Sequence, residues 1–406
     1  MRIAMVSEHA SPLATLGGVD AGGQNVHVAA LATALAGRGH LVDVYTRRDG
    51  GELSPRVRLT DGVDVFHVPA GPPRPLPKDD LPAFMPDFGR WLARAWQKGP
   101  RPDVVHSHFW MSGLAAIQAA GVVGLPVVHT FHALGSVKRR HQGAQDTSPP
   151  DRIDLERSIV ADVDLVVSTC RGEVEELARM GADVEHTRVV PCGVDLDLFT
   201  PKGPAWKAGS RRRRLVSVGR LVERKGVEVA VEALASLPDA ELIVAGGPAA
   251  EELGDDPEAR RLSARAEELG VAERLRLVGR VEHRDVPALL RSADVVVTTP
   301  WYEPFGIVPV EAMACGRPVV GSAVGGLLDT VDDGVTGFLV PPRDSAALVA
   351  AVCRLLDDRR MRARFGRAAR LRAVSRFGWS RVARDTESAY LEAISSRQLS
   401  AARKAV

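Results

Sequence analysis

The sequence of 406 residues predicts an α/β protein with two doubly wound domains. Short β-branched runs alternate with Ala-, Leu-, Glu- and Arg-rich amphipathic stretches, as in parallel sheets covered by helices on both faces. The alternation occurs twice, on either side of a segment near residues 191–212 that is rich in Pro and Gly, and the chain is too long for one compact core. We therefore expect domains at 1–200 and 201–380. A helical tail over 381–406 either caps its own domain or crosses back to the first.

The expected elements follow from these runs. The strands expected in the first domain are Ile3–Val6, Val42–Tyr45, Val63–Val68, Val104–His106, Val127–Thr130 and Leu165–Thr169, and those in the second are Leu215–Val218, Leu242–Ala245, Leu275–Val278, Val295–Thr298 and Val319–Ser322. The expected helices include Val26–Gly37, Asp151–Ala161, Gly172–Met180, Val227–Ala235, Asp256–Leu269, Val286–Arg291 and Val308–Ala314. Ligands of such sheets bind beyond the carboxyl ends of the strands, so two facing domains predict a deep cleft between them.

Composition excludes several classes of protein. The net charge of +2 argues against nucleic-acid binding by bulk charge. Four scattered cysteines with no CxxC pair predict neither a disulfide framework nor a structural zinc site. Without an 18-residue apolar run we expect no transmembrane segment, and the apolar stretch at the N-terminus is too short for a signal peptide, so we expect a cytoplasmic protein.

A glycine-rich segment, Gly17–Gly23, lies between the first expected strand and the first helix. Glycines there let the backbone approach a ligand, and a helix N-terminus offers unpaired N–H groups to an anion. The pattern is not GxGxxG, and a flexible tight turn is the alternative. Asn25 is either an ordinary helix residue or a group that holds an acceptor.

Two cations follow the first expected strand of the second domain. Arg220 and Lys225 lie at the start of the next helix, where its dipole also favours an anion. A diphosphate that leaves gains negative charge and needs such groups. The alternative is a surface pair that stabilises a loop.

Two carboxylates eight residues apart frame another helix start. Glu303 lies in the loop after Val295–Thr298, and Glu311 lies about one turn inside the next helix. Carboxylates accept protons from the vicinal hydroxyls of a sugar or ribose. The N–H groups around Gly306–Val308 suit a phosphate or sugar oxygen.

Four histidines accompany two neighbouring strands. His106 and His108 follow one expected strand, and His129 and His132 follow the next. A metal site is possible in principle, but no carboxylate stands at ligand spacing. A histidine near a reacting sugar orients a hydroxyl or shares charge; a structural role remains the alternative for each.

Together these motifs resemble the retaining nucleotide-sugar glycosyltransferases of family 4, which have the GT-B fold of two facing Rossmann-like domains. The resemblance covers nearly the whole chain. In the N-terminal half, the stretches Gly22–Val28, Lys78–Leu81 and His106–Trp110 are similar to the inositol-phosphate N-acetylglucosaminyltransferases of mycothiol synthesis and to sucrose(-phosphate) synthases.

The resemblance implies a role for each matching residue. Arg220 and Lys225 would bind the donor diphosphate, and Glu303 would hold hydroxyls of the donor sugar. Glu311 would hold the ribose diol. The remaining expected contacts are the backbone of Arg280 and Val281 with the base, the segment Phe305, Gly306, Ile307 and Val308 with the donor, Gly23 with the diphosphate, and His132 with the donor sugar. We expect Asn25, Lys78, His108 and Phe109 at the acceptor, and His132, Arg220, Lys225 and Glu303 to be catalytic.

This sequence departs from the mycothiol enzymes at two acceptor positions. They have a tyrosine where this chain has Phe109 and a threonine where it has Ala133, so two hydroxyl donors to an acceptor phosphate are lost. Asn25, Lys78 and Lys138 would still suit an anionic or polyol acceptor. The resemblance favours UDP-sugars as donors, with GDP-sugars next.

The expected mechanism follows from the resemblance and from what the motifs lack. There is no DxD-like pair to chelate a metal, so we expect no metal or other cofactor, with Arg220 and Lys225 supplying the charge. No carboxylate is an obvious nucleophile, which favours front-face transfer with retention of configuration. The partners expected are a nucleotide sugar and a small-molecule or glycan acceptor; a homodimer is left open.

Two other functions remain as alternatives. A nucleotide-sugar epimerase can share two facing doubly wound domains and would act on the donor alone. A non-catalytic partner subunit would keep the fold without the chemistry, although the presence of Arg220, Lys225, Glu303 and Glu311 argues against it.

Overall fold

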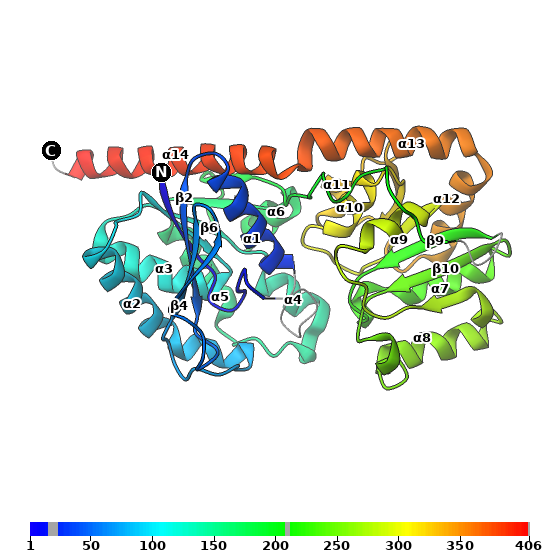
Figure 1. Cartoon of the computed structure of the whole chain (residues 1–406), viewed down its shortest axis with the longest axis horizontal. Helices are drawn as coiled ribbons and strands as arrows, with labels where there is room; N and C mark the ends of the chain where they lie inside the picture. Colours follow the sequence, from blue (N-terminus) through cyan, green and yellow to red (C-terminus); the bar gives the residue numbers. More distant parts are fainter. Residues whose placement is uncertain (15–22, 208–211, 405–406) are drawn as a thin grey trace. The chain divides into compact units, whose positions relative to one another are not determined.

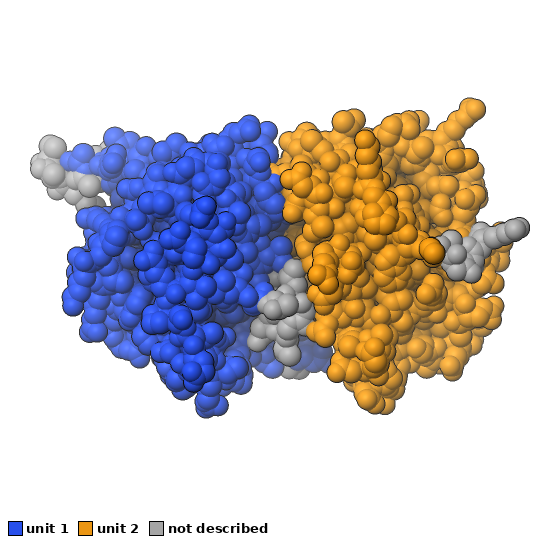
Figure 2. Space-filling view, in the orientation of Figure 1, with its two compact units in different colours: residues 1–193, 379–406 blue, residues 194–378 orange. Residues whose placement is uncertain are grey.

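The structure is a computed structural model that describes residues 1–14, 23–207 and 212–404. The chain divides into two compact units (Figure 2). Unit 1 comprises Met1–Gly193 and Trp379–Val406, and unit 2 comprises Val194–Gly378. The two are described separately below.

Unit 1 is built on an eight-stranded sheet with the strand order β3-β4-β2-β1-β5-β6-β7-β8 (Figure 1). Its strands are β1 (Arg2–Val6), β2 (Leu41–Arg47), β3 (Arg56–Thr60), β4 (Val63–Val68), β5 (Val104–His108), β6 (Val127–Thr130), β7 (Leu165–Ser168) and β8 (Thr187–Val189). All neighbouring strands pair in parallel except β3, which runs antiparallel to β4 at the edge. The edge strands β3 and β8 were not among the expected strands.

Helices cover both faces of this sheet. They are α1 (Gly23–Ala36), α2 (Met85–Lys98), α3 (Trp110–Val123), α4 (Gly135–Gln142), α5 (Arg152–Asp162), α6 (Arg171–Arg179) and α14 (Trp379–Lys404). Consecutive residues of β5 face opposite ways: Val105 packs in a core with α2 and α3, whereas Val104 packs in a second core with α1 and α14. This is the doubly wound arrangement. The tail helix α14 therefore completes the cover of unit 1, where its Tyr390 is fully buried.

Unit 2 is built on a six-stranded parallel sheet with the order β11-β10-β9-β12-β13-β14. Its strands are β9 (Arg213–Val218), β10 (Ala240–Ala245), β11 (Leu275–Leu277), β12 (Val295–Thr298), β13 (Val319–Ser322) and β14 (Gly337–Val340). Its helices are α7 (Val227–Ala235), α8 (Pro257–Glu268), α9 (Val286–Ser292), α10 (Ile307–Ala314), α11 (Leu327–Thr330), α12 (Ser345–Asp357) and α13 (Arg359–Arg372). Its apolar core joins β9, β10, β12 and β13 to α7, α8 and α12.

The expected α/β class with parallel sheets is confirmed, since both sheets are parallel apart from the edge strand β3. Among the described residues, no helix is both long enough and apolar enough to cross a lipid bilayer.

Candidate active site

The four predicted histidines lie in, or just beyond, two neighbouring strands of the unit 1 sheet. His106 and His129 lie within β5 and β6, inside the strands expected at Val104–His106 and Val127–Thr130, whereas β5 extends two residues further than expected and includes His108. His132 lies just beyond β6 and is the one of the four histidines that is partly exposed. The glycine segment before α1 lies outside the described residues up to Gly22; Gly23 is the first residue of α1.

The structure brings His108 and His132 together with a third histidine, His27 of α1. His108 Nδ1 lies 3.0 Å from His132 Nε2, and the His27 ring lies edge-on to both, with centroids 5.8 and 5.0 Å away. His27 was not predicted as a site residue. No local pattern links it to residues more than 80 positions away.

These three imidazoles are neutral at neutral pH. Burial lowers the pKa of His27 to about 4, and burial with the surrounding histidines lowers the pKa values of His108 and His132 well below the ordinary value. One nitrogen from each ring lies within 4.8 Å of the others, as metal ligands would. However, this group contains no carboxylate, and a divalent ion would bring two uncompensated charges into a buried site. The absence of a metal stays a prediction.

His106 connects this cluster to the tail helix. Its Nε2 lies 3.0 Å from Thr130 Oγ1 and its Nδ1 lies 2.7 Å from the Tyr390 hydroxyl. Thr130 gives its one proton to the carbonyl of Val167, so His106 Nε2 must carry the proton that Thr130 accepts. Nδ1 is then an acceptor, and Tyr390 donates to it. The His106 ring also packs on the His108 ring, with centroids 4.1 Å apart.

Backbone strain is concentrated beside this cluster. Phe109 and His132 have φ angles of 78° and 61°, and Arg343 is the third non-glycine residue with positive φ in the described parts of the chain. Such conformations cost of order 1–3 kcal/mol each and persist where the surroundings impose them, often at functional sites.

Two cations flank the Phe109 ring. Lys78 Nζ lies 3.7 Å from the ring centroid and the Arg152 guanidinium carbon lies 5.1 Å from it. Arg152 is buried, where it donates to Glu156 at 2.8 Å and to the Ala133 carbonyl at 2.8 Å. It was not predicted, because 43 residues separate it from Phe109 and a lone arginine in an Arg-rich chain carries no signal.

The other predicted acceptor residues are tied to the protein. Asn25 donates to the Ser11 carbonyl at 3.0 Å, and Lys138 pairs with Asp146 at 2.9 Å. Behind Lys78, the buried Glu8 contacts His9 and Ser112. Burial alone raises the pKa of Glu8, but His9, Ser112 and Lys78 outweigh it and lower the pKa overall.

In unit 2, Lys225 and Glu303 form an ion pair. Lys225 ends a short 3-10 turn after β9, and Glu303 lies in the loop after β12. Both side chains are partly exposed, at 24% and 16%. Arg220 follows β9 and is exposed. The structure thus brings together the cation and the carboxylate that the sequence placed on separate loops.

The two loops interlock through their backbones. Trp301 N–H donates to the Arg224 carbonyl at 2.9 Å, and Thr299 Oγ1 donates to the Gly226 carbonyl at 2.7 Å. Gly226 has φ 63°, and a Cβ there would lie 2.0 Å from the Thr299 carbonyl oxygen. Glycine is therefore required for this approach.

The Glu303 loop is fixed from its other side by Gly325 and Gly326. Gly326 N–H donates to the Glu303 carbonyl at 2.9 Å. A Cβ on Gly325 would lie 2.2 Å from that carbonyl oxygen. The carboxylate of Glu303 is thus carried by a backbone held at two points.

Helix α10 begins directly after this loop. Its N-cap is Gly306, with φ 90°, and its first residues Ile307 and Val308 are partly buried. Phe305 packs edge-on to Phe377, with centroids 6.1 Å apart. Glu311 lies just over one turn into the helix and is buried, with 6% of its surface exposed. Its Oε1 lies 3.1 Å from His283 Nε2.

The segment predicted to meet the base follows β11. Arg280 N–H donates to the Pro248 carbonyl at 2.8 Å, and Gly246 N–H donates to the Gly279 carbonyl at 2.8 Å. Val281 is partly buried and Arg280 is exposed. This loop and α10 are joined by the contact between His283 and Glu311.

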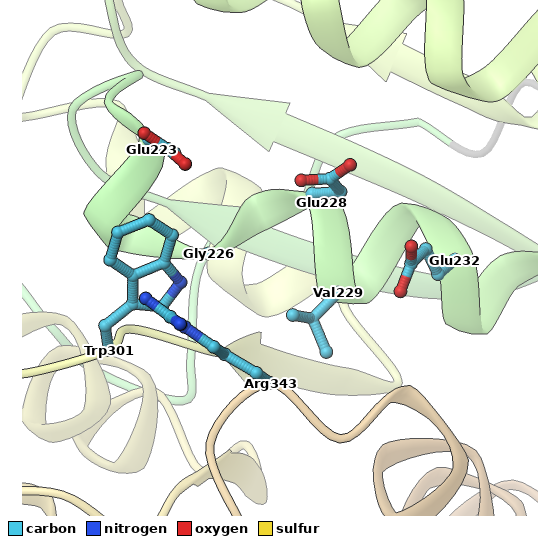
Figure 3. A pocket seen from close by; sticks show the side chains of 7 residues that line it. All are labelled: Glu223, Gly226, Glu228, Val229, Glu232, Trp301 and Arg343. Carbon is cyan, nitrogen blue, oxygen red and sulfur yellow. The ribbon is translucent and has the colours of Figure 1, made fainter.

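A cavity of about 300 Å³ lies beside the Lys225 loop (Figure 3). The lining side chains include Glu223, Glu228 and Glu232, and Arg343 stacks 3.9 Å from the Trp301 ring. Three carboxylates repel a diphosphate. Glu228 and Glu232 pair with arginines of α8, which gives these two carboxylates a structural role beside the cavity.

Comparison with known proteins identifies the family. Residues 21–198 match the family described as Glycosyltransferase Family 4, and residues 204–372 match Glycosyl transferases group 1. A D-inositol 3-phosphate glycosyltransferase of Xylanimonas cellulosilytica is 40% identical over 98% of this chain and 98% of its own. The chain belongs to glycosyltransferase family 4. A second D-inositol 3-phosphate glycosyltransferase, from Stackebrandtia nassauensis, is 38% identical over 98% of this glycosyltransferase and 93% of its own chain.

Solved structures of other proteins support the same fold. The sucrose-phosphate synthase of Thermosynechococcus elongatus superposes with a TM-score of 0.85 at 33% identity, covering 99% of both chains. Anabaena HepE, solved in complex with UDP, superposes at 0.73 with 20% identity, covering 96% of this glycosyltransferase and 99% of its own chain, and supports the GT-B fold alone. The expected family, fold and enzyme class are confirmed. These findings give no support to the epimerase alternative.

Proposed function

We propose that this glycosyltransferase moves a hexose, with retention of configuration and without a metal ion, from a nucleotide sugar to a phosphorylated polyol or sugar. A UDP-sugar is the first donor to test and a GDP-sugar the next. The observation that carries the proposal is the Lys225–Glu303 pair, held between two interlocked loops beside the start of α10.

The donor half of the proposal rests on unit 2. Lys225 with Arg220 would neutralise the diphosphate as it leaves, which is where charge develops in the transition state. Glu303 would then exchange its contact with Lys225 for hydroxyls of the donor sugar, and Glu311 would accept from the ribose diol. The backbone of Arg280 and Val281 would meet the base.

The acceptor half rests on unit 1. Lys78 and Arg152 place two positive charges against the Phe109 ring, which suits a phosphate on the acceptor. Relatives named D-inositol 3-phosphate glycosyltransferase support an acceptor of this class. Phe109 and Ala133 lack the hydroxyls of the mycothiol enzymes, so a different polyol phosphate or sugar phosphate is also tested.

His132 would contact the donor sugar, as the family resemblance implies. His108 Nε2 is buried and has no hydrogen-bond partner among the described residues. Since an orphaned buried N–H is rarer than an orphaned acceptor, His108 would carry its proton on Nδ1 and donate to His132 Nε2. The other nitrogen of His132 would then be the donor that meets a sugar hydroxyl.

The proposal is tested by measuring sugar transfer from UDP-glucose and UDP-N-acetylglucosamine, then from GDP-mannose. The acceptors are inositol 3-phosphate, fructose 6-phosphate and unphosphorylated inositol. We expect transfer only to a phosphorylated acceptor, and equal rates with excess EDTA. Lys225→Ala and Glu303→Ala should each lower the rate about 10²–10³-fold, while the exposed Lys202→Ala should not.

Each half of the proposal can fail separately. Full turnover by both unit 2 variants would remove the donor assignment. A preference for unphosphorylated inositol would remove the acceptor assignment. Donor incubated without acceptor must stay unepimerised, and the product linkage, read by NMR, must keep the anomeric configuration of the donor.

A further inference from the structure

His283 is a histidine that the proposed function does not use. It is the only one after residue 200, and it lies between the base-binding segment at Arg280 and Val281 and the start of α9. Its Nε2 lies 3.1 Å from Oε1 of Glu311 on α10. One side chain therefore joins the two elements to which base and ribose recognition are assigned.

The imidazole is held in place on several sides. The loop that carries it begins at Gly279, which has φ 69° and where a Cβ would lie 2.7 Å from the Ala250 nitrogen. The Phe199 ring lies edge-on to the imidazole, with centroids 5.2 Å apart. The side chain of His283 is 32% exposed and that of Glu311 is 8% exposed. A mostly buried carboxylate thus has a fixed donor at one oxygen.

We propose that His283 is a positioning residue for nucleotide recognition, holding Oε1 of Glu311 so that the second carboxylate oxygen accepts from the ribose diol. This rests on the proposed function, which assigns the ribose to Glu311. A carboxylate that is already held in position loses less conformational entropy when the nucleotide binds, and this increases the affinity. His283 itself touches neither the sugar nor the reacting atoms.

The charges around His283 give the contact a pH dependence. Glu311 faces it from α10 and Asp195 from the segment before β9, and the hydrogen bond to Glu311 raises the pKa of His283 above 6.5. Burial raises the pKa of Cys315 at the end of α10, and the cations Arg291 of α9 and Arg370 of α13 oppose that rise. Below the raised pKa the bond to Glu311 is charge-assisted. As pH rises through that pKa the charge is lost, so nucleotide affinity should fall.

The test uses calorimetric titration of the full chain with UDP and with 2′,3′-dideoxy-UDP, and GDP and ADP are titrated alongside UDP. His283→Ala should weaken UDP binding about 10- to 100-fold, the range for a hydrogen bond to a charged group. It should leave the weaker binding of the dideoxy nucleotide unchanged, because the diol is absent. His186→Ala, at an exposed histidine of unit 1, is the matched control.

His283→Gln separates charge from geometry. Glutamine keeps an N–H donor, so it should restore most of the affinity at pH 8 but lose the fall in affinity that the wild type shows between pH 6 and pH 8.5. Melting temperatures without nucleotide verify that both variants fold.

The failures are distinguishable. Equal loss for UDP and dideoxy-UDP, or no loss for either, would overturn the role of His283 while leaving the donor assignment intact. A wild type that binds none of UDP, GDP and ADP would overturn the proposed function, and this inference with it.

Discussion

The two units build their candidate sites by opposite means. In unit 1, His106, His108 and His129 are fully buried and neutral, and the backbone at Phe109 and His132 is strained. In unit 2, the site consists of charged side chains on loops that glycines allow to interlock, as at Lys225 and Glu303. Buried groups fix the first site, including the Arg152–Glu156 ion pair, whereas backbone hydrogen bonds and partly exposed charges fix the second.

This difference fits the ligands proposed for each unit. A leaving diphosphate gains negative charge during the reaction. Cations that the loops of unit 2 already hold in position would stabilise that charge as it develops. A neutral hydroxyl needs a donor of fixed tautomer and direction. Burial supplies this in unit 1, because it keeps the imidazoles neutral.

The largest expected contrast is between removing a cation from each unit. Arg152→Ala leaves the buried carboxylate of Glu156 without its cationic partner, so we expect a loss of about 3–5 kcal/mol in the free energy of unfolding. Lys225→Ala breaks a partly exposed pair and should cost about 1 kcal/mol at most, while abolishing most activity. Denaturant unfolding of both variants measures the contrast.

A double variant sharpens this comparison. Arg152→Met with Glu156→Gln removes both charges and should recover much of the stability lost by Arg152→Ala. If Arg152→Ala alone were no more destabilising than Lys225→Ala, the description of unit 1 as a site fixed by buried groups would be wrong.

The second contrast concerns pH. Glu173 in unit 1 accepts two hydrogen bonds from Thr169 and pairs with no cation among the described residues, and burial raises its pKa to about 7. Below pH 4.5 both folded and unfolded states are protonated. Between pH 4.5 and 7 the unfolded state loses its proton first, so ionisation lowers stability as pH rises, and above 7 the full loss is present.

Glu173→Gln removes this titration. The stability of the variant relative to wild type should therefore grow by about 3 kcal/mol between pH 4.5 and pH 8, measured by urea unfolding at several pH values. Glu175→Gln, at an exposed glutamate of the same helix, should show no such growth. A difference between Glu173→Gln and wild type that stays flat over this range contradicts the raised pKa.

Much of the fold could be predicted because its strands are continuous apolar runs. Val295–Thr298 and Val319–Ser322 match β12 and β13 residue for residue. The edge strand β3 was missed because it alternates arginines with Val, Leu and Thr and has no buried residue. Helix α3 was missed because it is apolar on nearly every side, so its periodicity carries no helical signal.

Candidate site residues could be predicted from the sequence only where they lie close together along the chain. Glu303 and Glu311 lie eight residues apart on either side of the start of one helix, so their spacing alone indicates a pair of carboxylates at one site. The contacts of His27 with His132, Arg152 with Phe109 and His283 with Glu311 join residues 28 to 105 positions apart. Residues so far apart in the sequence come into contact only in the folded protein, where the order of the strands decides which loops are neighbours.

The smallest predicted contrast lies between two glycines of unit 2. An alanine Cβ at Gly334 would have no atom within 4 Å, so Gly334→Ala adds only the strain of a side chain at φ 74°. This strain should lower the free energy of unfolding by about 1 kcal/mol. Alanine at Gly325, with φ 48°, would also press on the Glu303 carbonyl. We expect about 2 kcal/mol of lost stability and at least a tenfold lower kcat/KM, since Glu303 moves with its backbone. Equal kcat/KM for the two variants would show that the loop carrying Glu303 adjusts freely, and that unit 2 is not prepared by its glycines.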